Sequence, residues 1–358
     1  MPRTMFIVRC LQKSKKVLCR EVQNKYLVST NKNNSMPAAA LPIPIPLEEI
    51  KVAQQRIKGK VVRTPLLRLY LDEFPGEIYL KLENLQPIGS FKLRGACNAM
   101  LSASKDMLAD GVYTGSAGNM AQGVAWNAKA MGIPCTVIVP DHAPQTKLDA
   151  ITRLGAKYIK VPFDQWWQVL VTRQYEGMKG LFVHPVSDLP VIAGNGTIGL
   201  ELFEDLPDMD AVIVPYGGGG LISGIASAIS ALKPGTKVLA SETSTAAPLF
   251  PSLLVGSPQK ITHTPSFIDG IGAGGLLAEM WPLVSSLVNA SIVISPEEIA
   301  KAIKLLVQRS RVVAEGAGGS SVAAALTGKA GYGKIVCVVS GGNIDGEKIA
   351  KILNDQLP

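Results

Sequence analysis

A single lysine lies where the sequence otherwise predicts a turn followed by the start of a helix. In the segment PIGSFKLRGA (residues 87–96), Lys92 stands between the apolar residues Phe91 and Leu93. The positive end of a helix dipole and burial beside apolar groups both disfavour an ammonium group, so both lower the pKa of a lysine. A lysine that can lose its proton can form an imine with an aldehyde. The competing interpretation is an ordinary surface lysine in the first turn of a helix.

Two glycine-rich segments have the composition of anion-binding turns. In VPYGGGGLISG (residues 214–224), four consecutive glycines separate an apolar strand from a helix, so their backbone N–H groups can converge on a phosphate. The segment lacks the Gly-Lys-Ser/Thr of a Walker loop and the spacing of a dinucleotide-binding motif. In GSAGNMAQGVAW (residues 115–126), small residues again precede a helix, which suits a carboxylate, and Asn119 adds a side-chain donor and acceptor. An ordinary tight turn is the alternative for both segments.

A serine closes the last apolar run of the chain. Ser340 lies in VVSGGNID (residues 338–345), at the end of the expected strand, and its hydroxyl can donate a hydrogen bond to a ring nitrogen without protonating it. The alternative is a polar residue that begins a turn. Together, an imine-forming lysine, a phosphate-binding glycine loop, a second anion loop and a hydroxyl partner for a ring nitrogen describe a site for pyridoxal 5'-phosphate.

The four segments fall where strands are expected to lead into helices. Short Val/Ile-rich runs alternate with helical apolar spacing, which predicts an α/β protein with doubly wound, mainly parallel sheets in two lobes. Ligands of such folds bind beyond the carboxyl ends of the strands. The expected strands are 78–83, 111–116, 134–140, 157–162, 211–215, 237–242 and 334–342, and the expected helices are 47–57, 91–101, 120–132, 145–155, 221–232 and 296–310.

The basic charge of the chain is concentrated in its first 36 residues. That segment holds eight Lys or Arg residues and one Glu, a balance of +7 within a net charge of +8 for all 358 residues, so the remainder is near neutral and a nucleic-acid-binding surface is not expected. A basic, acid-poor N-terminus with scattered apolar residues predicts a mitochondrial presequence and hence the matrix. The alternatives are an extension of a cytoplasmic protein, or translation from Met36.

Three further features exclude other classes of protein. The longest uncharged run, 211–232, contains a proline and the four glycines, so it predicts a strand, a loop and a helix in the core rather than a membrane span. The five cysteines form no CxxC pair, which favours a reducing compartment over a zinc site or a disulfide framework. The three histidines fall in neither a GxSxG nor an HExxH context. We therefore expect neither a serine hydrolase nor a metal site.

From about residue 47 to 353, the motifs and their order resemble the threonine/serine dehydratase and serine racemase family, pyridoxal-phosphate enzymes of the tryptophan-synthase-β-like fold. The resemblance implies that Lys92 holds the cofactor aldehyde, Asn119 contacts the ring hydroxyl and Ser340 faces the pyridine nitrogen. It assigns the cofactor phosphate to Gly217, Gly218, Gly219, Gly220 and Leu221, and the substrate carboxylate to Ser116, Ala117, Gly118, Asn119 and Met120.

The resemblance also implies an organisation and an assembly. It places a large cofactor-binding domain at 45–110 and 187–358 and a small domain at 111–186, while residues 1–44, outside the resemblance, are expected to form a basic extension and a Pro-rich linker. A homodimer is expected, and the short stretch after Ser340 predicts a chain without the regulatory domain of feedback-controlled threonine deaminases.

Three residues depart from the pattern of that family. Met120 stands where relatives commonly carry His, which leaves the substrate preference open. Ala117 occupies the place of the serine with which racemases act on the second face of the substrate. In SETSTAAP (residues 241–248), Glu242 and Ala246 are kept, but Pro248 replaces an acidic ligand of the racemases' cation site, so a divalent ion is not expected there.

The resemblance implies a β-elimination that converts L-threonine or L-serine to 2-oxobutanoate or pyruvate and ammonia, with Lys92 as the base. An amino-acid racemase is the alternative enzyme. Such an enzyme needs acid–base groups on both faces of the substrate. A catalytically impaired cofactor-binding protein is the alternative from another class, suggested by Met120.

Overall fold

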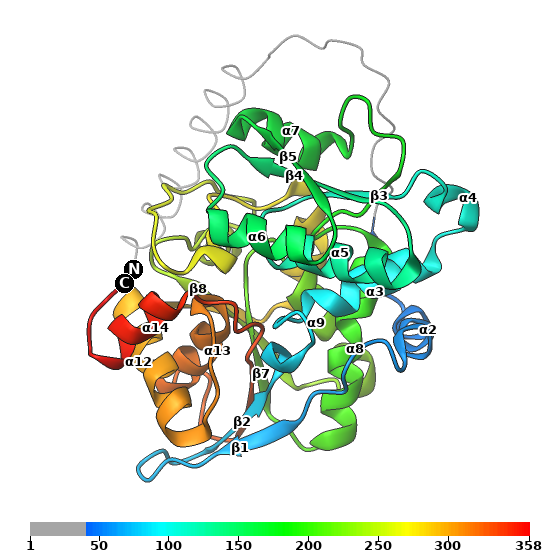
Figure 1. Cartoon of the computed structure of the whole chain (residues 1–358). Helices are drawn as coiled ribbons and strands as arrows, with labels where there is room; N and C mark the ends of the chain where they lie inside the picture. The colour runs from blue at the N-terminus through cyan, green and yellow to red at the C-terminus, as the bar shows by residue number, and fades with distance from the viewer. Residues whose placement is uncertain (1–40) are drawn as a thin grey trace, which may run out of the picture. The chain divides into compact units, whose positions relative to one another are not determined.

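The computed structural model describes residues 41–358, which form two β-sheets with helices around them (Figure 1). Every pair of neighbouring strands is parallel except β1 and β2. The six-stranded sheet runs in the order β1 (Leu66–Leu69), β2 (Glu77–Lys81), β10 (Lys334–Val338), β7 (Ala211–Pro215), β8 (Lys237–Thr243) and β9 (Ala290–Ile294). The four-stranded sheet runs in the order β5 (Lys157–Val161), β4 (Cys135–Pro140), β3 (Val112–Gly115) and β6 (Leu181–Phe182). The predicted fold class is therefore confirmed.

The helices that carry or support the candidate residues begin directly after strands or turns. They are α2 (Leu47–Ile57), α3 (Lys92–Ser102), α5 (Asn119–Met131), α8 (Leu189–Asp205), α9 (Gly220–Leu232) and α13 (Gly316–Leu326). The others are α4 (Lys105–Leu108), α6 (Gln145–Arg153), α7 (Phe163–Thr172), α10 (Leu249–Val255), α11 (Trp281–Leu287), α12 (Pro296–Leu305) and α14 (Gly346–Leu353). Short helical turns lie at Glu83–Leu85, Asp269–Ile271, Ala278–Met280 and Leu306–Ser310.

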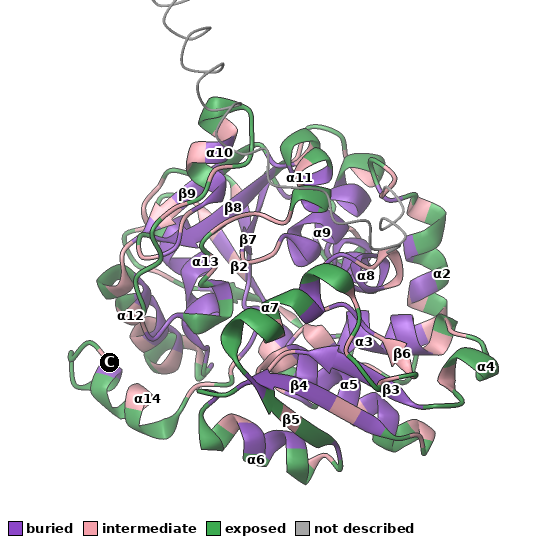
Figure 2. Ribbon diagram, turned by 90° about the horizontal axis from the view of Figure 1, so that it is seen from above, coloured by how far each residue is buried: buried purple, intermediate pink, exposed green. Residues whose placement is uncertain are grey.

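Each sheet is covered on both faces. Side chains of the fully buried strand β7 alternate, so Val212 and Val214 pack with α8 and α9 while Ala211 and Ile213 pack with α12 and α13. In the four-stranded sheet, α3, α5 and α6 pack on one face and α7 on the other. Figure 2 accordingly shows β7 and β8 as buried, whereas much of α7 and α14 is exposed. This double cover explains why the strands read as continuous apolar runs.

The uncharged run 211–232 forms β7, the glycine turn and α9, as predicted. Among residues 41–358, no helix is long and apolar enough to cross a bilayer. The predicted presequence lies outside the described residues.

Several boundaries differ from the sequence-based expectation. The last strand ends at Val338, so the expected strand 334–342 is too long and Ser340 lies in the following turn. The reason is that Val339 and Ser340 accept hydrogen bonds from Asn84 and Phe91 in neighbouring turns rather than continuing the ladder. The strands β1, β6 and β9 were not predicted. The two-residue β6 and the edge strand β1 are too short for a clear alternating pattern.

All four strands of the smaller sheet come from residues 112–182, inside the segment expected to form the small domain. The division into two domains stays a proposal.

Candidate functional site

Two turns at the carboxyl ends of the adjacent strands β2 and β10 are joined through their backbones. The N–H of Phe91 donates to the carbonyl of Ser340 at 3.0 Å, and the N–H of Gly342 donates to the carbonyl of Gly89 at 2.9 Å. Ser90 and Gly341 form a β-bridge between these two bonds. Gly89 has a φ of 73°, a conformation that glycine adopts without strain. The turn before Lys92 and the turn that carries Ser340 are thus one connected unit.

Lys92 lies in the first turn of a helix, as predicted, and is the first residue of α3. Its Nζ donates to the carbonyl of Pro185 at 2.5 Å and lies 5.2 Å from the centre of the Phe91 ring. Burial lowers the pKa of Lys92 to about 8, against the opposing charge of Glu315, which raises it. An appreciable fraction of this amine is therefore neutral near physiological pH, the form that attacks an aldehyde.

The glycine turn between β7 and α9 presents free donors at a helix start. Within residues 41–358, no backbone N–H from 217 to 222 donates to a protein acceptor. The side chain and carbonyl of Val186 press against the turn: a Cβ on Gly218 would lie 2.6 Å from Val186 Cγ2, and one on Gly220 would lie 2.5 Å from its carbonyl oxygen. Gly219 has a φ of 95°. Glycine is therefore required at several of these residues, and the free amides at the α9 N-terminus suit a phosphate.

The segment 116–120 supplies a second set of donors where α5 begins at Asn119. The N–H of Gly118 donates to the hydroxyl of Ser116 at 3.2 Å. The backbone N–H groups of residues 119–121 make no hydrogen bond to any described residue. Ala117 contacts the apolar cluster formed by α3, α5 and the four-stranded sheet, and the side chain of Met120, 1% exposed, is part of that cluster. At Met120, the free backbone N–H is therefore the group available to a ligand.

The hydroxyl of Ser340 has no hydrogen-bond partner in the described part of the chain, although Ser340 is only 2% exposed. Asn119 is held by two residues: its Nδ2 donates to Glu315 Oε1 at 2.9 Å, and its Oδ1 accepts from Asn343 Nδ2 at 2.7 Å. The structure thus joins Asn119 to the turn that carries Ser340 and leaves the hydroxyl of Ser340 available to a ligand.

Glu315 is a site residue that the sequence analysis missed. It is buried, and its N–H donates to the carbonyl of Gly341 at 3.0 Å, which places it beside Ser340 and Asn119. Burial raises the pKa of Glu315 to about 7, with the charge of Asp269 adding to the shift and the hydrogen bond from Asn119 opposing it. The available signal was a lone acid directly before the glycine-rich start of α13, in VVAEGAGGSS.

Three hydrogen-bond donors, two from α10 and one from β9, surround Glu242, in the segment that resembles the racemases' cation site. Its two oxygens accept hydrogen bonds from the N–H groups of Leu249 and Phe250, each at 2.8 Å, and from the hydroxyl of Ser291 at 2.5 Å. Burial raises its pKa to about 7, against the lowering effect of these bonds. Backbone N–H groups at the start of α10 present positive charge, and Pro248 has no ligand atom in its side chain. These residues do not fit a divalent cation.

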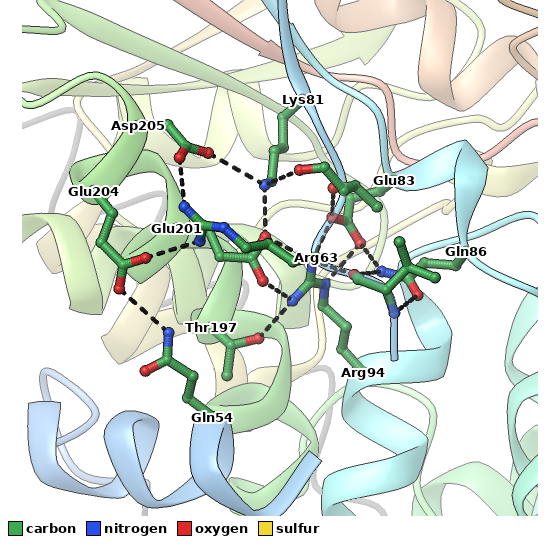
Figure 3. Close-up of polar contacts among 12 residues, drawn as sticks. Gln54, Arg63, Lys81, Glu83, Gln86, Arg94, Thr197, Glu201, Glu204 and Asp205 are labelled. Atoms are coloured by element: carbon green, nitrogen blue, oxygen red, sulfur yellow. Dashed lines mark hydrogen bonds and ion pairs between the residues drawn. The ribbon is translucent and has the colours of Figure 1, made fainter. Parts of the chain in front are cut away.

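A buried network of charges links α3 to neighbouring elements (Figure 3). Arg94, two residues after Lys92, donates to both oxygens of Glu83 and both oxygens of Glu201. Lys81 from β2 also binds Glu201, at 2.5 Å. All four side chains are at most 6% exposed. The network ties α3 to β2 and α8 with two positive and two negative charges.

Residues 57–341 match the model of the pyridoxal-phosphate dependent enzyme family. The chain belongs to this family. An L-threonine ammonia-lyase of Thermotoga maritima is 44% identical over 321 residues, which are 87% of this chain and 79% of that protein. The serine racemase of Dictyostelium discoideum is 38% identical over 87% of this chain and 98% of its own. Its crystal structure gives a TM-score of 0.78 and covers 84% of this chain and 99% of that chain. The processed threonine deaminase isoform 2 of Solanum lycopersicum, 28% identical, also gives 0.78, covering 91% and 99%.

The residues present fit the cofactor of this family. A neutral lysine amine suits its aldehyde, the free amides at 217–222 suit its phosphate, and the unpartnered hydroxyl of Ser340 suits a ring nitrogen.

Proposed function

We propose that this protein is a pyridoxal-phosphate-dependent ammonia-lyase that converts L-threonine and L-serine to 2-oxobutanoate and pyruvate. The observation that carries the proposal is Lys92, an amine of lowered pKa at a helix start, joined through its turn to Ser340. The names of relatives at 36–44% identity, L-threonine ammonia-lyase and L-threonine dehydratase, support this activity.

In the proposed site, the free amides at 217–222 hold the cofactor phosphate, Lys92 binds the cofactor aldehyde, and Ser340 donates to the ring nitrogen. The residues proposed for the phosphate are Gly217, Gly218, Gly219, Gly220 and Leu221. The amides of the 116–120 segment hold the substrate carboxylate and so orient the α-carbon. The bound cofactor withdraws electrons from that carbon and makes its proton acidic.

The amino group of the substrate would take the place of Lys92 at the cofactor aldehyde. The freed amine of Lys92 would then accept the α-proton. The β-hydroxyl leaves with a proton as water, and a water molecule returns at the α-carbon as the nitrogen departs as ammonia. The elements of water leave and return, so one amino acid gives one 2-oxo acid and one ammonia. A hydroxyl donates to the ring nitrogen without fully protonating it. We therefore expect the β-hydroxyl to be lost faster than a proton returns to the α-carbon.

Racemisation is the second candidate, because a serine racemase is among the similar proteins. That reaction removes the α-proton on one face and returns a proton on the other. The resemblance places the second group at residue 117, where the methyl of Ala117 neither donates nor accepts a proton. This residue favours elimination over racemisation.

The test is to add L-threonine and L-serine to purified protein, record its visible absorption and assay 2-oxo acid with a coupled dehydrogenase. The proposal expects a cofactor absorption band that changes with substrate and a steady yield of 2-oxo acid. D-serine formed faster than pyruvate would favour the racemase. A band that responds without product would favour a catalytically impaired cofactor-binding protein. We further propose a homodimer, located in the mitochondrial matrix or the cytoplasm.

A further inference from the structure

The amide of Asn119 is held from two sides by residues that lie far away in the sequence. Its Nδ2 donates to Glu315 Oε1 at 2.9 Å, and its Oδ1 accepts from Asn343 Nδ2 at 2.7 Å. Asn119 begins α5 beside the four-stranded sheet, whereas Asn343 and Glu315 lie in turns beside the six-stranded sheet. Neither partner was among the site residues expected from the sequence.

The direction of the Asn119 amide follows from its partners. The oxygen and nitrogen of an asparagine amide have nearly the same shape, so hydrogen-bond partners must decide which is which. Asn343 Nδ2 also donates to the backbone carbonyl of Ile88, at 2.9 Å. A carbonyl can only accept a hydrogen bond, so the side-chain atom of Asn343 that faces both Ile88 and Asn119 must be its NH₂ nitrogen. This NH₂ needs an acceptor, so the oxygen of Asn119 faces Asn343. The NH₂ of Asn119 therefore faces Glu315.

The two ends of this chain of bonds are fixed by the backbone. Ile88 precedes Gly89, whose carbonyl accepts from Gly342 at 2.9 Å. At the other end, the N–H of Glu315 donates to Gly341 at 3.0 Å, and a Cβ on Gly341 would lie only 2.4 Å from Glu315 Oε1. The Glu315 carboxylate is therefore seated against Gly341, and Ile88 is seated by the turn before Lys92. The Ile88 carbonyl cannot turn without disturbing the backbone contacts between the two turns, and the Glu315 carboxylate is held by its close packing against Gly341.

We propose that Asn343 and Glu315 are positioning residues that hold Asn119 as a hydrogen-bond donor toward a bound cofactor. One hydrogen of Asn119 Nδ2 is used by Glu315, which leaves the other for a ligand. The oxygen of Asn119 is turned toward Asn343. An incoming group thus meets an N–H, which selects an acceptor and favours an anionic oxygen such as the ionised ring hydroxyl of the cofactor. This inference rests on the proposed function only in taking that cofactor as the ligand.

The test is a double-mutant cycle on the affinity of cofactor-depleted protein for pyridoxal phosphate, measured by absorbance titration. Loss of a charge-assisted donor in Asn119→Ala is expected to weaken binding about 10-fold or more. In Asn343→Asp, an oxygen replaces the NH₂, so Asn119 must turn its own NH₂ toward it and away from the ligand. We expect a loss comparable to that of Asn119→Ala. In the Asn119→Ala background, Asn343→Asp should then cause no further loss, because the residue acts through Asn119.

Asn84→Asp is the matched control. Asn84 Nδ2 likewise donates to a backbone carbonyl, that of Val313 at 3.1 Å, but Asn84 makes no hydrogen bond to Asn119. The control should keep the parental affinity. Glu315→Gln retains an oxygen that accepts from Asn119 and should bind within about 3-fold of the parent, whereas Glu315→Leu should resemble Asn119→Ala. If Asn343→Asp does not fold, Asn343→Ala completes the same cycle without a new charge.

A spectroscopic measurement separates this role from general support of the fold. A donor stabilises the ionised ring oxygen, so its loss raises the pKa of that oxygen. The pH midpoint of the cofactor's visible absorption should therefore move upward in both Asn119→Ala and Asn343→Asp, and not in Asn84→Asp. Additive losses in the cycle, or an unchanged midpoint in Asn343→Asp, overturn the inference.

Failure of the inference and failure of the proposed function give different results. If the parent protein makes no 2-oxo acid but the cycle is non-additive, the proposed function is wrong and the positioning role stands. If the parent makes 2-oxo acid but Asn119→Ala binds the cofactor as tightly as the parent, the positioning role is wrong and the lyase stands.

Discussion

Removal of Arg94 from the buried charge network around α3 is expected to destabilise the protein by an amount that depends on pH. Arg94→Met replaces a guanidinium that donates to Glu83 and Glu201 with an apolar side chain of similar length. Glu201 keeps Lys81 as a partner at 2.5 Å, whereas Glu83 keeps only Thr64 and Gln86 as hydrogen-bond partners, with the charge of Lys81 as a weaker stabilising influence. Removing one partner of a buried ion pair costs about 3–5 kcal/mol, because the other charge stays buried. We expect a destabilisation of that size at pH 8.

The loss should shrink in acid. In the parent, burial acts to raise the pKa of Glu83, but Arg94 outweighs it and holds the pKa below its ordinary value. Without Arg94, burial dominates and the folded-state pKa of Glu83 rises above that of the unfolded chain. The folded variant then binds a proton more tightly than the unfolded chain does, so its stability falls as pH rises through the new pKa. The gap between variant and parent is therefore expected to be smaller at pH 5 than at pH 8.

Urea unfolding of both proteins at the two pH values, followed by circular dichroism, measures this gap as a shift in midpoint. Arg63→Met is the control, because Arg63 also pairs with two acids, Glu204 and Asp205, but is 48% exposed. Its loss should be about 0–1 kcal/mol at either pH, as for surface ion pairs. A loss for Arg94→Met no larger than the control, or one that grows in acid, refutes the reasoning.

Four further predictions concern the site and the chain's N-terminus. Ala117→Ser should raise D-serine relative to pyruvate made from L-serine, because a positioned acid–base group contributes about 10²–10⁴-fold; an unchanged ratio contradicts the role of residue 117. Cofactor uptake by depleted protein should accelerate about tenfold per pH unit below pH 8 and level off above it, since the neutral amine of Lys92, with a pKa of about 8, is the reacting form; a stopped-flow rate independent of pH argues against Lys92. Activity should be unchanged by a chelator or by added Mg²⁺ or Ca²⁺, because the oxygens of Glu242 are occupied by N–H and O–H donors; activation by either ion shows that the cation site is intact. A protein that starts at Met36 should keep its full cofactor content, measured by absorbance, if residues 1–36, with their charge balance of +7, are the targeting segment that we propose; loss of cofactor assigns that segment to the fold.

The parts of the fold and site that the sequence predicted are those that depend on local patterns. Lys92 at a helix start, the glycine turn before α9 and the strand–helix alternation each occupy a few consecutive residues. Their chemistry depends on backbone donors and helix ends, which composition and order reveal. These local patterns also predicted two lobes of mainly parallel sheet.

Contacts between distant residues could not be predicted in the same way. Asn119 and Glu315 are separated by 196 residues, and Arg94 and Glu201 by 107. No period or spacing connects such pairs, since only the packing of whole elements brings them together. The boundary at Val338 was missed for a related reason: hydrogen bonds from distant turns, rather than apolar composition, end the strand. A carboxylate such as Glu315 therefore becomes a site residue only once the fold is known.

The central place of β10 in its sheet has a consequence for insertions and deletions. The strand is bonded to β2 on one side and to β7 on the other, with Cys337 opposite both Leu80 and Ile213. Two ladders hold its register, and a slip of one residue would turn every side chain to the opposite face. A change in length within the turn 327–333 can therefore be absorbed outside the sheet without moving Ser340. An insertion or deletion two residues after the strand would instead shift Ser340, Gly341 and Gly342 relative to their hydrogen-bond partners. We therefore expect natural variation in length in the turn before β10 and not in the turn after it.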